Sequence, residues 1–447
     1  MKKITLSLAT MLAAVAFAPD ASAIPAFARQ VGMACSACHY QHFPVLNSFG
    51  RAFKQGGYTM IGAQEKIEAE GISLPGTLNA ALVGYMQYQK TNGPTTGSTP
   101  TNKSTNDGLG QVPQQVSLFF GGRAGEHIGF ETEINVSGAG VDTGATTGTG
   151  IIRLKVPFVY DVGSVKVGVI PFSTQGLGVA DSFEVLNTGA VGVHAFNQSD
   201  MAAVSAQQYI GTGTAASGMA FIASNDSFFV NFAKWAPNVG TGTSGSSTAS
   251  YLRAAWTPGG LISGFDSAVG VQIWNGTGWT DNTPASFDPT GGTAIPVPGT
   301  LGGIVDTKAS AIDAQLMGDV SGMPLLAVAS YAKAPKQGGN LNPNLFNGGT
   351  ADKHSFNIAA ELGVIPNKAT VQFGIRRASS GNAIGAISNA TDNAILLGGT
   401  YNIALNARME LTYTKYSGDM YNAASAAAQG TNYMGDTKTT LDLAFGF

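Results

Sequence analysis

The feature that most constrains the fold is an alternation of apolar and polar side chains with a period of two, which recurs up to the last residue. In the stretch 128–136 one face is apolar and the other polar: Ile128, Phe130, Ile134 and Val136 against Glu131, Glu133 and Asn135. A period of two indicates β-strands, and apolar side chains facing lipid with charged ones facing a lumen are typical of membrane barrels. A soluble sandwich also alternates, with its polar residues facing bulk water.

The connections between the alternating segments are of two kinds, long polar stretches and short turns. The long ones are 91–111, 138–150, 174–217, 237–248, 276–307, 335–350, 379–391 and 417–436. The segments between connections predict an all-β outer-membrane barrel of about sixteen antiparallel strands, an even number as bacterial barrels require. The 174–217 connection is long enough to conceal another strand pair or a short helix. Short turns mark the periplasmic end, so we expect extracellular loops and periplasmic termini.

Composition and the carboxy terminus favour the same interpretation. A chain of 447 residues with 60 glycines and 11% charged residues is unusual for a soluble enzyme. The final stretch 441–447 alternates up to a terminal aromatic, Phe447, and resembles the carboxy-terminal signature of outer-membrane barrels. Trp235, Trp256 and Trp274 fall near predicted strand ends, where aromatic girdles are expected. We therefore predict contact with outer-membrane lipid.

The amino terminus has the pattern of a signal peptide. Lys2 and Lys3 precede the apolar run 4–18, and the small residues 21–23 suit cleavage, so 1–23 is predicted to be removed and the mature chain to begin at Ile24. The net charge is −3 for the whole chain. Because the signal holds two lysines and Asp20, its removal makes the net charge −4. This balance gives no indication of nucleic-acid binding.

The two cysteines of the chain, Cys35 and Cys38, stand in a C-x-x-C-H arrangement with His39. This spacing lets two thiols form thioethers to one haem, while the following histidine supplies an axial nitrogen to the iron. A disulfide or a redox dithiol is the alternative for such a pair in an exported protein. No thioredoxin-like βαβ pattern surrounds the motif, so we predict one covalent haem c with His39 as the axial ligand.

The stretch 24–73 around this motif is predicted to be a monohaem cytochrome c domain, and 74–447 the porin-like barrel. About fifty residues are too few for an ordinary core, so the haem and a neighbouring structure must supply buried surface. The lumen of a barrel of about sixteen strands is a natural place for this domain. Arg29 and Arg51 are candidate partners of the haem propionates, although either arginine could instead be solvated or paired with the barrel.

Five short runs in this stretch are similar to a known family: F-A-R-Q at 27–30, the haem motif, P-x-L at 44–46, F-G-R-x-F at 49–53 and G-Y at 57–58. They resemble the amino-terminal signature of outer-membrane porin–cytochrome fusions that oxidise ferrous iron. Beyond these residues only barrel architecture and chain length agree. The resemblance implies an iron oxidase, that is an Fe(II):cytochrome c oxidoreductase. Its haem passes electrons from extracellular Fe(II) to a periplasmic c-type cytochrome or another soluble carrier.

The sixth iron ligand is the least determined part of the site. Met60 is the favoured candidate, Met33 is an alternative, and an open site is a third option. His42 is too close to His39 to reach the opposite haem face easily. The other histidines, 127, 194 and 354, are predicted to be solvated. The loop carboxylates 142, 181, 184, 281 and 288 could attract Fe(II), but we expect them to be solvated as well.

Two other functions remain open at this stage. The chain could be an outer-membrane porin in which the haem-bearing segment is a structural or gating plug. It could also be an electron conduit with a different extracellular donor, such as an electrode, a mineral or a reduced sulfur compound. A covalently attached redox cofactor is an improbable plug, which favours electron transfer.

Overall fold

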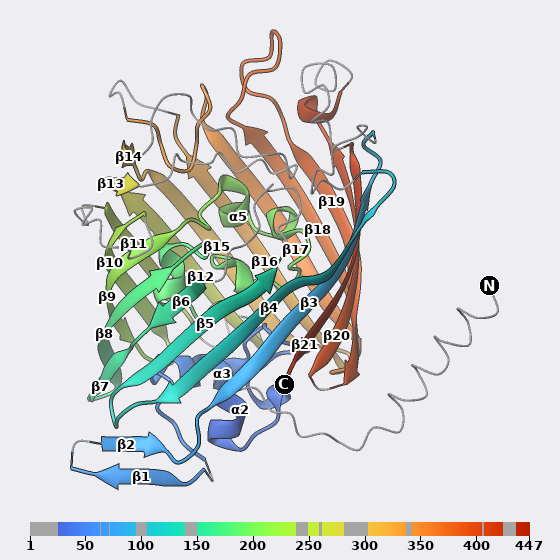
Figure 1. Ribbon diagram of the computed structural model, residues 1–447. Coiled ribbons are helices and arrows are strands. Elements are labelled where there is room, and N and C mark those ends of the chain that lie inside the picture. Colours follow the sequence, from blue (N-terminus) through green and yellow to red (C-terminus); the bar gives the residue numbers. More distant parts are fainter. Residues whose placement is uncertain are drawn as a thin grey trace, which may run out of the picture.

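Figure 1 shows the computed structural model of the chain. The structure describes residues 26–62, 64–70, 72–94, 105–138, 150–237, 249–258, 262–280, 303–336, 342–404, 406–422 and 435–447. The predicted signal peptide and the acids Asp142, Asp281 and Asp288 lie outside these residues. Within the described ranges, no helix combines the length and the apolar character needed to cross a membrane.

The described part of the chain forms a closed antiparallel β-barrel, as the alternation predicted. Its strands are β3 (Ala80–Thr91), β4 (Leu109–Arg123), β5 (Gly129–Gly138), β6 (Gly150–Lys155), β7 (Phe158–Val162), β8 (Val165–Thr174), β9 (Ala216–Ser224), β10 (Phe228–Ala236), β11 (Ala249–Trp256), β12 (Phe265–Asn275), β15 (Ala309–Val320), β16 (Met323–Ala334), β17 (Lys353–Ile365), β18 (Ala369–Ser380), β19 (Asn393–Ala404), β20 (Ala407–Ser417) and β21 (Thr437–Gly446). β6 and β7 occupy one strand position, because Pro157, which has no N–H to donate, lies between them and both pair with β8. The described barrel therefore has sixteen strand positions, which confirms the predicted count.

The barrel closes where β21 pairs with β3. Phe447 extends this pairing, since its N–H donates to the Leu82 carbonyl at 2.9 Å and its carbonyl accepts from the Leu82 N–H at 3.0 Å. Gly84 leaves room on β3 for the Phe445 ring, which would lie 2.3 Å from an added Cβ. The terminal aromatic stretch thus contributes directly to closure, which leaves no open sheet edge in the wall.

Side chains alternate across the wall as predicted. Large apolar side chains of many strands are exposed outward, among them Phe221, Phe232, Ile312, Phe356, Leu397 and Leu411. Charged side chains such as Arg153, Arg253, Asp313, Glu361 and Arg376 are buried on the inner face. An apolar outer face is the surface that a membrane barrel presents to lipid.

The tryptophans depart from the expected girdle. Trp256 is exposed at the end of β11, but Trp235 and Trp274 are almost completely buried within one apolar cluster inside the barrel. The girdle interpretation is therefore wrong for these two. A position near a strand end does not determine which face of the sheet a side chain occupies. The register along β10 and β12 determines it, and it places both indoles on the inner face.

The two ends of the barrel differ in their connections. The short turns lie at one end, together with the start of β3 and with the carboxy terminus, and the strand ends that the long connections join lie at the other end (Figure 1). A small sheet of β13 (Thr277–Thr280) and β14 (Gly303–Asp306), and the turn η4 (Asp419–Tyr421), belong to the long-loop end.

The residues before β3 gather at the short-turn end. They form α2 (Ala26–Val31), the 3-10 turn η1 (Cys35–Ala37), α3 (Ser48–Gln55) and a hairpin of β1 (Lys66–Ala69) and β2 (Ile72–Pro75). Figure 1 shows α2 and α3 at the mouth of the barrel and the β1–β2 hairpin projecting below it. The two cysteines lie between α2 and α3, in η1 and directly after it.

The connection between β8 and β9 folds into the lumen. It contains η2 (Val179–Ser182), η3 (Gly192–His194), α4 (Met201–Val204) and α5 (Ala206–Ile210), so of the two alternatives, a strand pair or a short helix, the helix is the correct one. Residues 178–210 are buried, except for four that are half-buried: Val193, Gln198, Ser199 and Met201. η2 packs against β8 to β11, and α4 and α5 pack against β16 to β19. This lumen loop therefore crosses the barrel from one wall to the other.

Candidate functional site

The C-x-x-C-H motif forms one tight turn. The backbone N–H groups of Cys38 and His39 both donate to the Cys35 carbonyl, at 3.1 and 2.9 Å. Both cysteines are free thiols and half-buried, so the structure has no disulfide between them. Burial raises the pKa of each thiol above its usual value. Burial thus favours the neutral thiol form of both cysteines.

The imidazole of His39 is oriented by its own loop. Residues 39 to 46 form a narrow turn, in which the Tyr40 N–H donates to the Val45 carbonyl at 2.8 Å. The same carbonyl lies 3.2 Å from Nδ1 of His39. Because a carbonyl can only accept, Nδ1 carries the hydrogen and the lone pair is on Nε2. Burial lowers the pKa of His39 to about 4, which keeps the ring neutral. This is the tautomer and orientation that a metal-ligating histidine needs.

The N-terminus of helix α3 contacts the turn and holds it in place. Its N-cap Asn47 accepts from the Gly50 N–H at 2.9 Å, and its side-chain amide donates to the Ala37 carbonyl at 2.9 Å. The Asn47 N–H also donates to the Cys38 carbonyl at 2.9 Å. Gly50 has no side chain to separate the helix from the turn, since an added Cβ would lie 2.2 Å from the Cys38 oxygen. The glycine of the F-G-R run is thus required by close backbone approach.

Helix α2 and the chain after α3 form a small aromatic core. Phe27 stacks on Tyr58 at 4.8 Å, contacts Phe53 edge-on at 5.3 Å and reaches Phe119 of β4 at 5.6 Å. The Tyr58 hydroxyl donates to Glu131 of β5 at 2.7 Å. The F-A-R-Q and G-Y runs therefore have a packing role against the barrel wall.

The two candidate propionate partners have different surroundings. Arg51 is largely buried and forms an ion pair with Asp266 of β12 through one nitrogen, while its Nη1 has no hydrogen-bond partner among the described residues. Arg29 is exposed and donates to the Ala80 carbonyl. A buried guanidinium nitrogen without a partner is costly, so Arg51 retains a donor for an anionic group, whereas Arg29 has no such feature. Both assignments stay predictions.

The structure does not distinguish the two methionine candidates for the sixth ligand. Met33 and Met60 are both exposed, with 40% and 45% of the residue surface accessible. Met60 follows Tyr58 on the segment that doubles back to α2, where Gln30 donates to its carbonyl at 2.6 Å. Neither methionine is buried as core packing would require, so both remain candidates. If the segment binds the predicted haem, exposed apolar side chains such as these are ones that a porphyrin would cover.

His42 is engaged with the barrel instead. Its Nε2 lies 2.7 Å from Oε1 of Glu361 on β17, and its Nδ1 accepts from Arg408 of β20 at 2.6 Å. The ring and the Glu361 carboxylate are almost completely buried. With both ring nitrogens occupied, His42 fixes the 39–46 loop to two wall strands. The sequence carried no signal for this contact, because Glu361 and Arg408 are hundreds of residues away.

Further wall contacts surround the same segment. The Tyr40 hydroxyl donates to the Gly318 carbonyl of β15, and Gln55 donates to the Asn225 carbonyl between β9 and β10 at 3.2 Å. Together with the contacts to β4, β5, β12, β17 and β20, these bonds reach most of the barrel circumference. The segment therefore sits in the mouth of the lumen as a fixed plug.

The lumen loop meets the plug from the other side. The Leu46 N–H donates to Asn187 at 2.9 Å, and the Asn187 amide donates back to the Leu46 carbonyl at 2.8 Å. Lys54 of α3 donates to Nε2 of His194 at 3.2 Å, because Nδ1 of that ring faces the Leu186 carbonyl. Two inserted segments are thus joined to each other inside the barrel.

These contacts correct three expectations of solvated loop residues. His194, Asp181 and Glu184 are all buried. Asp181 lies 3.4 Å from the Lys155 amine of β6, and Glu184 pairs with Arg253 of β11 at 2.9 Å. The expectation was wrong because the connection folds inward, where lumen-facing cations of the wall supply its partners. His127 and His354 are half-buried, beside Tyr160 and Tyr331 respectively.

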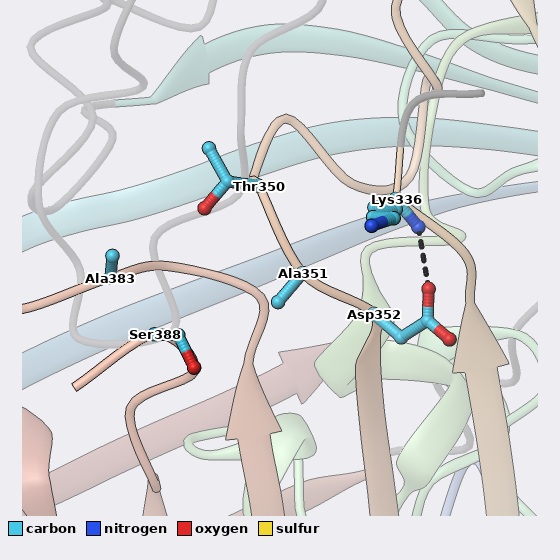
Figure 2. Close-up of a pocket in the computed structure, with 6 residues that line it drawn as sticks. All are labelled: Lys336, Thr350, Ala351, Asp352, Ala383 and Ser388. Carbon is cyan, nitrogen blue, oxygen red and sulfur yellow. Dashed lines mark hydrogen bonds between the residues drawn. The ribbon is translucent and has the colours of Figure 1, made fainter. Parts of the chain in front are cut away.

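A separate pocket lies at the long-loop end, between the connections that follow β16 and β18 (Figure 2). Its volume is about 420 Å³, and it is lined by Lys336, Thr350, Ala351, Asp352, Ala383 and Ser388. Asp352 accepts from the Lys336 N–H at 2.9 Å and pairs with Lys333 at 2.7 Å. Among the described residues no three carboxylate, histidine or cysteine side chains group as a metal site.

Fold and site together define a class: a closed sixteen-strand barrel whose lumen is crossed by a loop and whose short-turn mouth holds a C-x-x-C-H segment. Neither protein-family models nor curated proteins match this chain. The chain is similar in structure to OmpT of Vibrio cholerae (10% identity, 86% of this chain and 100% of that chain, TM-score 0.45) and to the outer-membrane channel DcaP of Acinetobacter baumannii (11%, 85% and 99%, 0.46). It is also similar to OmpF of Salmonella typhi, in a complex with daunomycin (12%, 86% and 100%, 0.47).

Proposed function

We propose that this chain is an outer-membrane c-type cytochrome that oxidises extracellular Fe(II) and passes the electron through one haem to a periplasmic carrier. The observation that carries the proposal is the Cys35–His39 turn, with two free thiols and a histidine whose Nδ1 faces the Val45 carbonyl. In this proposal the long loops face outward and both termini face the periplasm, as short turns do in bacterial barrels. The resemblance of the 27–58 runs adds the donor, Fe(II).

The residues of the chain have distinct roles in this proposal. Cys35 and Cys38 tether the haem by two thioethers, and His39 supplies the axial nitrogen. The Val45 carbonyl holds the imidazole in the ligating tautomer. The Asn47–Gly50 contact of α3 and the His42–Glu361 contact fix the turn against the barrel. When bound, the haem supplies a site that takes up and returns a single electron.

The overall reaction is balanced with one electron. One Fe(II) is oxidised to Fe(III) outside the membrane, and one equivalent of an oxidised periplasmic carrier is reduced. Ferric iron precipitates near neutral pH, so the product is best kept outside the periplasm. The barrel contributes a passage for charge across a membrane that otherwise blocks it.

The second candidate function is that of a porin with a haem-bearing plug. The closed barrel fold favours it, because such barrels enclose an aqueous lumen. The buried lumen loop and the plug argue against free passage of solutes, since both are fixed to the walls. Conductance in planar bilayers separates the two functions. A cytochrome conduit should conduct few ions, and a steady conductance typical of open porins would favour the porin.

The proposal is tested on purified, haem-loaded protein mixed with Fe(II) in a stopped-flow spectrometer. We expect haem reduction within seconds and reoxidation by a soluble acceptor. The variant Cys38→Ala, purified in the same way, is the control for non-covalent haem. Slow reduction by free Fe(II) would refute iron oxidation. Rapid reduction by an electrode or a reduced sulfur compound would then identify a different donor.

Orientation is tested in intact cells with Fe(II) held by a chelator too large for the lumen. If the donor acts from the long-loop side, the chelated iron should still reduce the haem, although more slowly. Haem reduction that occurs only after the outer membrane is permeabilised would contradict the proposed direction of electron flow.

A further inference from the structure

The β1–β2 hairpin has an apolar face that the barrel does not cover. Ile67 and Leu74 are a cross-strand pair, exposed at 57% and 38%. The opposite face is turned to the wall, where the Ser73 hydroxyl contacts Glu68 and the Arg123 side chain of β4, each at 3.0 Å. An isolated two-stranded ribbon is marginally stable. The packing of the described residues does not explain why this apolar pair is exposed on the hairpin.

The hairpin is tied to the segment that carries the cysteines. Gln64 before β1 donates to Asn79 after β2 at 2.8 Å, and Asn79 donates to Gln30 of α2 at 3.3 Å. Gln30 in turn donates to the carbonyls of Tyr58 and Met60, both at 2.6 Å. A protein that binds the hairpin is therefore held beside α2 and the Met60 segment.

The charge of this end is acidic. The hairpin carries Glu65, Glu68 and Glu70 against Lys66, and Lys66 is paired with Glu68 at 2.9 Å. The short turns at the same end add the exposed acids Glu126, Asp161 and Asp319, against the cations Lys368 and Lys166, of which Lys166 pairs with Asp161 at 2.6 Å. A surface of this sign repels anionic lipid headgroups and a second copy of itself, and attracts a basic protein.

The geometry points to the β1–β2 hairpin as the docking surface of a basic, soluble electron carrier. This inference rests on the proposed function and adds where the electron leaves the protein. Ile67 and Leu74 form the apolar centre of the contact, and the glutamates form its charged rim. Electron-transfer encounters bury little surface, and rim charges set their association rate.

The test uses mitochondrial cytochrome c as a basic carrier and its succinylated, acidic form as the control probe. Reoxidation of the reduced protein by the basic carrier should be about threefold to tenfold slower in Glu65→Lys, and should slow with added salt. The matched control is Asp226→Lys, the same charge change at an exposed turn four strand positions along the barrel from β4. It should retain most of the wild-type rate. Equal rates for both variants, or faster reaction with the succinylated carrier, would overturn the docking site.

A second measurement does not require electron transfer. Calorimetry measures the binding of the basic carrier to the full chain in detergent. Ile67→Ser and Glu65→Lys should weaken this binding, and Asp226→Lys should not. Unchanged binding in the hairpin variants refutes docking even if Fe(II) reduces the haem. Weakened binding supports docking even if Fe(II) does not. Preferential binding to anionic vesicles, or dimerisation abolished by Ile67→Ser, would also refute it.

Discussion

Replacing Gly50 by alanine should loosen the support of the cysteine turn. The added Cβ would lie 2.2 Å from the Cys38 oxygen and 3.0 Å from its carbonyl carbon, both backbone atoms that no side-chain rotation can move away. Relief requires α3 to shift by about 1 Å, and overpacking of this kind costs about 1–3 kcal/mol. The shift also stretches the bonds from Asn47 to the Cys38 and Ala37 carbonyls, each worth about 1 kcal/mol.

One term opposes this loss, because alanine is favoured over glycine inside a helix by about 1 kcal/mol. The net expectation is a local destabilisation of about 2–4 kcal/mol, which corresponds to about 30- to 700-fold faster amide exchange in α3. Hydrogen–deuterium exchange with mass spectrometry measures it, and haem content per chain should fall in the same sample.

Gly56 provides the matched control at the other end of α3. Its φ is −75°, and an added Cβ would make ordinary contacts of 3.5 Å with the carbonyl oxygens of Ala52 and Phe53. Gly56→Ala should therefore exchange like the wild type. If Gly50→Ala also exchanged like the wild type and kept its haem, the close approach of helix and turn would not be what supports the site.

The other predictions concern attachment, anchoring and pH. Cys35→Ala or Cys38→Ala should each lose covalent haem on a denaturing gel, because the chain has no further cysteine; full staining would disprove the attachment. His42→Ala leaves the buried Glu361 carboxylate without its histidine partner, so the 39–46 loop should be destabilised by about 1–3 kcal/mol in hydrogen exchange. Burial lowers the pKa of Lys54 from 10.5 to about 7. The unfolded segment then binds more protons between these values, so the stability of α3 should rise with pH from about 7 to 10.5, and Lys54→Met should remove the rise. A rise that persists in this variant would show that another group is responsible.

The barrel could be predicted because its signal is local and repeated. Each strand carries its own period of two. Charged residues such as Glu131 on β5 and Arg153 on the neighbouring β6 identify the inner face of their strands from the sequence alone. The break at Pro157 changes one strand into two pieces without altering the count. The predicted side of the wall was wrong where it depends on the register of a whole strand, as for Trp235 and Trp274, which are buried inside the barrel.

The interior could not be predicted in the same way. Glu184 is a loop carboxylate by sequence, yet it meets Arg253, which itself holds Asp313 at 2.7 Å. Each of these groups comes from a different element, and only closure of the barrel brings them together. Burying these charges costs hydration, which their mutual attraction and hydrogen bonds offset once the barrel has closed. No local pattern distinguishes such a carboxylate from a solvated one.

The candidate site also has a local part, which the sequence predicts, and a part that depends on long-range contacts. The turn of Cys35, Cys38 and His39 is a local motif, and its spacing alone is the basis of the haem prediction. The supports of the turn were partly visible, since the F-G-R run contains the glycine that α3 needs. The contacts of His42 with β17 and β20 were not, because they depend on which strands the segment meets in the mouth of the barrel.

The plug and the lumen loop depend on each other, which bears on what the barrel is for. Asn187 holds the backbone of Leu46 by two hydrogen bonds, and His194 holds Lys54 of α3. A solute could pass only if these contacts and those of the plug with the wall opened together. Such an arrangement is costly for a diffusion channel, because every opening would expose several buried polar groups at once. It suits a scaffold that holds the cysteine turn in one place, which is what electron transfer through a single fixed centre requires.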